Sequence, residues 1–105
     1  QDLVQAVALY RKACDGRDAD ACSHLGAMYA NGTGVREDTF QAIALFRKAC
    51  DGGSKEGCNS LGWMYEYGKG VKQNYTEALK YYAKACDLKN QDGCDNYAQL
   101  KTGKR

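Results

Sequence analysis

The sequence lacks several features that would point directly to a function. Its 105 residues include no proline, one tryptophan and one histidine, and a single histidine, His24, cannot supply the cluster of ligands that metal-dependent hydrolysis needs. No run approaches the roughly 18 apolar residues of a transmembrane helix, so no membrane span is expected. The net charge is only +2, and acidic and basic residues are interspersed, which argues against nucleic-acid binding. No signal peptide is visible, so a secreted protein with this sequence would be a mature form or an excised segment.

Cysteine, by contrast, is abundant and regularly placed. The six cysteines form three pairs with an internal spacing of eight positions, and each pair begins 36 residues after the one before. A short chain with a modest aliphatic core often needs covalent reinforcement, and an even number of regularly spaced cysteines is typical of disulfide-bonded proteins from oxidising compartments. We therefore expect secretion or export, with the disulfides Cys14–Cys22, Cys50–Cys58 and Cys86–Cys94.

Zinc binding and redox catalysis are the alternative uses of these cysteines. A structural zinc site commonly uses CxxC spacing and often histidine, and redox catalysis uses CxxC or a lone thiol of low pKa. Neither pattern is present. The sequence therefore predicts no metal site and no cofactor.

Helix signals recur with the same period of 36 residues. One set of helix caps is Asp2, Asp38 and Asn74, each followed three positions later by Gln or Glu, which is capping-box spacing. The helices that they open, here called B helices, place apolar residues at positions i, i+3, i+4, i+7 and i+8, which is one face of an α-helix. In the first B helix this face consists of Ala6, Leu9, Tyr10, Ala13 and Cys14.

A second set of caps opens the A helices, at Asp18, Ser54 and Asn90. The first two A helices carry Gly26 and Gly62 at equivalent positions despite the cost of glycine inside a helix, which indicates a close helix crossing. They end at NGTGV (31–35) and YGKGV (67–71), where the first glycine is expected to take the left-handed conformation. The third A helix is more polar and no GxGV follows it, as expected for a terminal repeat with no neighbour to cover it.

These patterns predict an all-α solenoid of six antiparallel helices, an α/α superhelix without strands. The whole chain, 1–105, is expected to form one repeat array. Its expected parts are a partial repeat with one B helix (1–17), two full repeats (18–53 and 54–89) and a C-terminal capping helix (90–105).

The strings LGAMYANGTGV and LGWMYEYGKGV, followed by AIALFRKACD and ALKYYAKACD, resemble Sel1-like repeats. With the cysteine pair added, the chain resembles the Helicobacter cysteine-rich protein family. Sel1 repeats usually carry proline after GV, where this chain has Arg36 and Lys72. The resemblance implies a superhelix with the A helices on its concave side, and secretion from a bacterium or export to its periplasm.

The resemblance leaves two functions open. Members of the group resemble adaptors for protein interaction, so the first hypothesis is a scaffold that binds a protein or an extended peptide. Some members are described as penicillin-binding proteins or β-lactamases, so the alternative is a binder of β-lactams or peptidoglycan-related ligands with weak β-lactamase activity. An S-x-x-K motif is absent, because the three serines are followed three positions later by Gly26, Gly57 and Trp63. No catalytic residue is therefore assigned.

The candidate binding residues are those that vary between repeats while the framework is retained. They share one face of the A helices, which lines the groove of a solenoid. Trp63 is expected to anchor a ligand there, Asn59 and Asp95 to bind its backbone, and Glu66 to favour a positive charge. The candidate groove residues are Ser23, Ala27, Asn59, Trp63, Glu66, Tyr67, Asp95 and Gln99.

Overall fold

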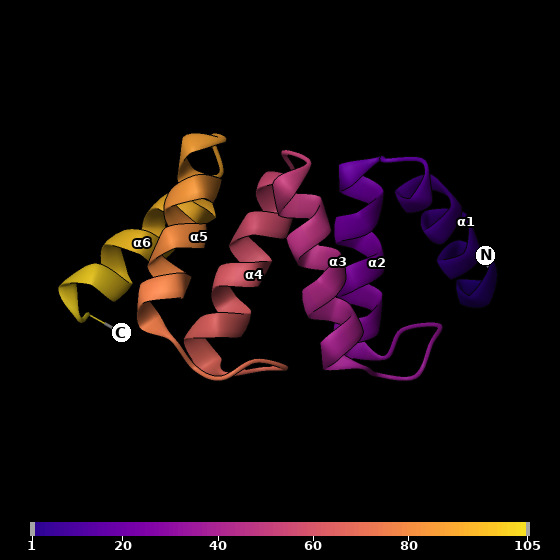
Figure 1. Ribbon diagram of the computed structural model, residues 1–105, viewed down its shortest axis with the longest axis horizontal. Coiled ribbons are helices and arrows are strands. Elements are labelled where there is room, and N and C mark those ends of the chain that lie inside the picture. The colour runs from indigo at the N-terminus through magenta and orange to yellow at the C-terminus, as the bar shows by residue number, and fades with distance from the viewer. Residues whose placement is uncertain (1, 105) are drawn as a thin grey trace.

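The computed structural model describes residues 2–104, which form six helices and no strand (Figure 1). Gln1 and Arg105, the two ends of the predicted array, lie outside the described residues. The B helices are α1, α3 and α5, and the A helices are α2, α4 and α6. Their bounds are α1 Leu3–Asp15, α2 Ala19–Asn31, α3 Thr39–Asp51, α4 Lys55–Tyr67, α5 Tyr75–Asp87 and α6 Gln91–Thr102.

Each helix begins at the residue that the sequence predicts as its cap. The side-chain oxygen of Asp38 accepts a hydrogen bond from the Gln41 amide at 3.1 Å, and that of Asn74 accepts one from the Glu77 amide at 3.0 Å. The A helices α2 and α4 end at Gly32 and Gly68, with φ of 68° and 65°. Glycine suits both positions because other residues rarely adopt this left-handed conformation.

All three predicted disulfides are present. They join Cys14 to Cys22, Cys50 to Cys58 and Cys86 to Cys94, with Cα–Cα distances of 4.6, 4.5 and 4.5 Å. Each bridge connects the last turn of a B helix to the first turn of the following A helix. The bridges therefore fix the turn within each helical hairpin.

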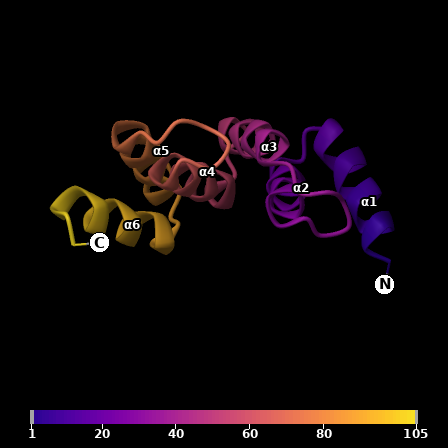
Figure 2. The ribbon, with the colours of Figure 1, turned by 90° about the horizontal axis from the view of Figure 1, so that it is seen from below.

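The helices form two layers in an elongated superhelix with dimensions of 42 × 24 × 20 Å. The A helices form a continuous inner layer, in which α2 contacts α4 and α4 contacts α6. Within residues 2–104 the backbones of the B helices do not approach one another, and each B helix packs against its neighbouring A helices (Figure 2). Side chains of neighbouring B helices do meet, as in the hydrogen bond from Arg47 to Tyr81 and the ion pair of Lys84 with Asp51. No helix in the described part of the chain combines the length and hydropathy needed to cross a membrane.

The predicted close crossing lies where each A helix meets the next B helix. A Cβ atom at Gly26 would lie 2.8 Å from the Phe46 ring, and one at Gly62 would lie 2.7 Å from the Tyr82 ring. Glycine is therefore required by packing at both positions. The equivalent residue of α6 is Ala98, which is exposed.

Leu9 belongs to the apolar face predicted for the first B helix, but it is not buried. Leu9 is 64% exposed, whereas its equivalents Leu45 and Tyr81 are 9% and 6% exposed. The difference arises because α2 covers α3 and α4 covers α5, whereas no A helix of the described chain covers the corresponding face of α1. The apolar pattern of a B helix thus predicts which face can be buried, and burial itself depends on the neighbouring repeat.

An arginine joins three helices near the centre of the array. Arg47 of α3 donates hydrogen bonds to the hydroxyls of Tyr65 in α4, at 2.7 Å, and Tyr81 in α5, at 3.0 Å. The two tyrosine rings stack with centroids 5.7 Å apart. The hydrogen bond to Tyr65 is the main cause that raises the pKa of Arg47 above its usual value. Arg11 makes the equivalent contact with Tyr29.

Candidate functional site

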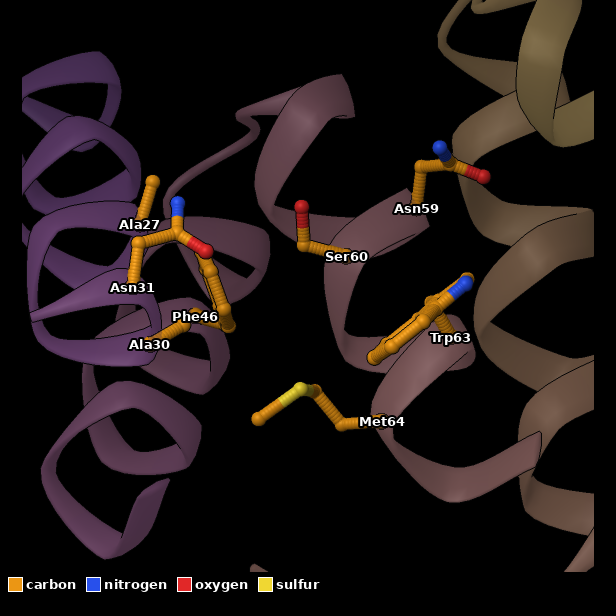
Figure 3. Close-up of a pocket in the computed structure, with 8 residues that line it drawn as sticks. All are labelled: Ala27, Ala30, Asn31, Phe46, Asn59, Ser60, Trp63 and Met64. Carbon is orange, nitrogen blue, oxygen red and sulfur yellow. The ribbon is translucent and has the colours of Figure 1, made fainter. Parts of the chain in front are cut away.

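A cavity of about 290 Å³ lies between α2 and α4 in the A-helix layer (Figure 3). Small side chains of α2 and the Phe46 ring form one side, and Trp63 and Met64 of α4 lie on the other. Small residues on α2 leave room where a larger side chain on α4 stands opposite. The lining residues are Ala27, Ala30, Asn31, Phe46, Asn59, Ser60, Trp63 and Met64.

Trp63 forms the aromatic wall of this cavity and is open to solvent. Its side chain is 43% exposed, and its ring packs against Tyr67, one turn later, with centroids 4.9 Å apart. Its equivalents in the other A helices are Ala27 and Gln99, so no repeated packing contact requires a tryptophan here. An exposed aromatic pair beside a cavity is the kind of surface that binds apolar or cationic side chains.

Asn59 lies next to Trp63 on the wall of the cavity. Its Oδ1 accepts a hydrogen bond from Nδ2 of Asn96 in α6 at 2.9 Å. This contact joins α4 to α6 and holds the Asn59 amide in one orientation, with its own Nδ2 still available as a donor. On the opposite side of the cavity, the exposed Asn31 supplies a second amide.

The prediction that Glu66 lines the groove and favours a positively charged ligand is wrong. Glu66 is only 4% exposed, and its Oε1 accepts a hydrogen bond from the Tyr82 hydroxyl at 2.6 Å. The repeats show a signal that could have revealed this pair. In the preceding repeat, Ala30 is the equivalent of Glu66 and Phe46 is the equivalent of Tyr82. The carboxylate of Glu66 and the hydroxyl of Tyr82 are therefore gained together in one repeat, as expected for two side chains that contact each other. Glu66 therefore belongs to the α4–α5 interface and cannot select a cationic ligand beside Trp63.

The other predicted groove residues are dispersed. Ser23 is 8% exposed and borders a separate depression with Asp20, His24 and Glu56. Asp95, on α6, is exposed and accepts a hydrogen bond from Gln91 at 3.0 Å. Gln99 is exposed on the same helix, and neither residue borders the cavity of Trp63. Of the eight predicted groove residues, the structure brings Ala27, Asn59 and Trp63 together in this cavity.

The remaining cavity residues were missed mainly because they belong to the framework or lie at its edge. Phe46 and Met64 are buried, Ser60 is half-buried, and Asn31 is the last residue of α2. The apolar pattern of α3 predicts that Phe46 belongs to the core, where most of its ring does lie. Asn31 could have been recognised as a polar residue at the end of the same helix face.

The cap residue Ser54 and the single histidine, His24, make structural contacts. The Ser54 hydroxyl accepts a hydrogen bond from the Gly57 amide at 3.1 Å as the cap of α4. His24 is exposed and stacks on Tyr10, with ring centroids 5.1 Å apart. Within the described residues, no three histidine, cysteine, aspartate or glutamate side chains are grouped to hold a metal ion. Nothing in this geometry favours the β-lactam alternative over peptide binding.

Several solved structures are similar to this chain, among them those of three repeat proteins. Helicobacter pylori cysteine rich protein B is 36% identical, with a TM-score of 0.81 over 85% of this chain and 67% of its own. A protective antigen of uropathogenic Escherichia coli strains, displaying an SLR fold, is 36% identical, with a TM-score of 0.87 over 91% of this chain and 21% of its own. A Sel1 repeat protein from Oxalobacter formigenes is 31% identical, with a TM-score of 0.92 over 99% of this chain and 42% of its own.

This chain thus spans less than half of two of these proteins and about two thirds of the third. None of the curated proteins compared with it matches. The profile of the Sel1 repeat matches three consecutive segments, residues 1–18, 19–54 and 55–90. With its helical hairpins, its glycine crossings and these matches, the chain belongs to the Sel1 repeat family.

Proposed function

We propose that the chain is an interaction scaffold that binds an extended segment of a partner protein in the cavity between α2 and α4. The observation that carries this proposal is Trp63, a 43% exposed tryptophan beside a cavity, at a position where the other A helices have Ala27 and Gln99. Sel1 repeats are typical of scaffolds with protein partners, and this position varies between the repeats while the caps, the cysteines and the crossing glycines of the framework recur.

The cavity has the size and polarity for one side chain and its adjoining backbone. Trp63 and Met64 provide an apolar surface for the side chain. The Asn59 and Asn31 amides stand at either side of the cavity and can bond to backbone amide and carbonyl groups of an extended segment. A single cavity of this size offers little contact area, so binding at this cavity alone is weak.

The proposed location is outside the bacterial cytoplasm, either in the periplasm or secreted. Three disulfides in 105 residues are typical of oxidising compartments. The likeness to Helicobacter pylori cysteine rich protein B, whose name marks it as rich in cysteine too, supports this proposal.

Binding by displayed peptides tests the proposal. Random dodecapeptides without tryptophan are selected on the oxidised chain, and the best are synthesised with a fluorescein label. Trp63 is the only tryptophan, so quenching or enhancement of its fluorescence reports binding at the cavity. We expect Trp63→Ala to weaken binding at least about tenfold, as truncation of a central aromatic does, in fluorescence polarisation.

Phe40→Ala is the matched control, because Phe40 is an aromatic residue on α3 that is 77% exposed and does not border the cavity. It should leave the affinity unchanged. Thermal unfolding should show that both variants keep the stability of the parent. Peptides that bind Trp63→Ala as tightly as the parent would refute the proposed site.

A further inference from the structure

Charge is divided unequally between the two helix layers. The A helices contain five acidic and two basic residues, a formal charge of −3, and the B helices contain four acidic and six basic residues, a formal charge of +2. The whole chain has a net charge of +2. The helices that carry the cavity are therefore net acidic, although the molecule as a whole is slightly basic. In the loop after α4, Lys69 stands near Trp63 at the other end of the cavity.

Two exposed acidic residues lie in the first turns of the two helices that enclose the cavity. Glu56, Ser60 and Trp63 occupy positions i, i+4 and i+7 of α4, so they share one face. Asp20 is the equivalent of Glu56 on α2, and both border the depression that also contains His24. Between the same two helices, an acidic rim at their N-terminal ends is thus followed by the cavity of Trp63.

These carboxylates are available to a ligand. Asp20 and Glu56 are both exposed, and no lysine or arginine within residues 2–104 lies at ion-pair distance from either. The ion pair found among these residues, Lys84–Asp51 at 3.9 Å, is on the B helices. Acidic residues in the first turn also favour the helix dipole, but that role leaves their carboxylates facing solvent, where they attract positive charge.

The distance between the acidic rim and Trp63 determines how far apart the matching residues of a ligand must be. Seven residues separate Glu56 from Trp63, which corresponds to about 10 Å along the helix axis. Two residues of an extended segment span about 7 Å and place both side chains on the same side. A lysine or arginine side chain is long enough to span the remaining distance between the segment and the carboxylates.

We propose that the cavity binds an apolar side chain of an extended partner segment. A lysine or arginine two positions away in that segment is held at the rim formed by Asp20 and Glu56. This inference rests on the proposed function, since it names the ligand chemistry of the same cavity. Charge complementarity selects the basic residue, and Trp63 with Met64 selects the apolar one. An acidic segment is repelled by the A-helix layer.

The probe is the dodecapeptide selected above, with a second peptide in which its basic residue is replaced by glutamate. We expect the selected set to be enriched in an apolar residue with a lysine or arginine two positions away, and the glutamate peptide to lose binding. The double variant Asp20→Asn/Glu56→Gln should bind the basic peptide about three- to tenfold more weakly in 50 mM salt, a range set by two exposed ion pairs. The difference should shrink in 500 mM salt because exposed charges are screened.

Asp51→Asn is the matched control, because it removes an exposed acid from the B-helix layer and should leave the affinity unchanged. Peptides that depend on Trp63 but carry no basic residue, or that ignore the double variant, would overturn this inference and leave the proposed function intact. Peptides that ignore Trp63 would overturn both.

Discussion

Replacing Gly62 by alanine sets two known effects against each other. Gly62 lies in the middle of α4, where alanine is intrinsically favoured over glycine by about 1 kcal/mol. The new Cβ, however, would lie 2.7 Å from Cδ1 of Tyr82 and 3.2 Å from the carbonyl oxygen of Ala78. The sign of the change in stability therefore depends on whether α5 can move away.

The packing around Tyr82 makes a movement of α5 away from α4 costly in free energy. The Tyr82 ring is 0% exposed, and its hydroxyl is held by the buried carboxylate of Glu66 at 2.6 Å. Overpacking a buried site costs about 1–3 kcal/mol, and the upper end applies because a backbone oxygen is involved as well as the ring. After the gain in helix propensity, Gly62→Ala should lower the free energy of unfolding by about 2 kcal/mol.

Urea unfolding of the oxidised protein, followed by circular dichroism at 222 nm, measures this difference. Ala98→Gly is the matched control, because Ala98 occupies the equivalent position on α6 and is exposed. It should cost about 1 kcal/mol through helix propensity alone. A Gly62→Ala protein as stable as the parent, or more stable, would refute the argument that glycine is needed for the α4–α5 crossing.

Two further predictions concern the covalent and polar links between helices. Cys50→Ala/Cys58→Ala should lower the free energy of unfolding by about 2.5 kcal/mol, the chain-entropy value for a nine-residue loop, in the same urea assay. A loss below about 0.5 kcal/mol would contradict the entropic account of the bridge. Arg47→Met should cost about 1–2 kcal/mol by removing the hydrogen bonds to two tyrosine hydroxyls. Lys48→Met, at the exposed neighbouring position, is its control, and equal losses in the two variants would show that the tyrosine contacts add nothing.

The helices and the disulfides could be predicted from the sequence because both are determined by neighbours in the chain. A cap such as Ser54 bonds an amide three residues away, and each cysteine pair spans eight residues. The glycine crossing was also predictable, because glycine weakens a helix and its recurrence at one helical position indicates that another element approaches closely there. Three aligned copies within one chain made these local signals visible.

The positions of side chains between repeats were less predictable. Glu66 varies from its equivalent Ala30, as a groove residue would, but its partner Tyr82 lies on the following helix. Leu9 has the periodicity of a core residue, but its burial needs a neighbouring A helix. In both cases the burial of the side chain depends on contacts between neighbouring helices. Such contacts can be predicted only by comparing two positions at once, one from each helix.

The alanine at position 98 has a consequence for self-association. A stack of identical arrays, each end resting on the next, would form an interface that never closes, and such contacts build filaments. If a second copy placed its α1 on α6 as α3 is placed on α2, its Tyr10 ring would take the position of Phe46, which is 2.8 Å from a Cβ at the equivalent Gly26. Ala98 has that Cβ. One methyl group, that of Ala98, therefore disfavours the packing of α1 of a second copy against α6.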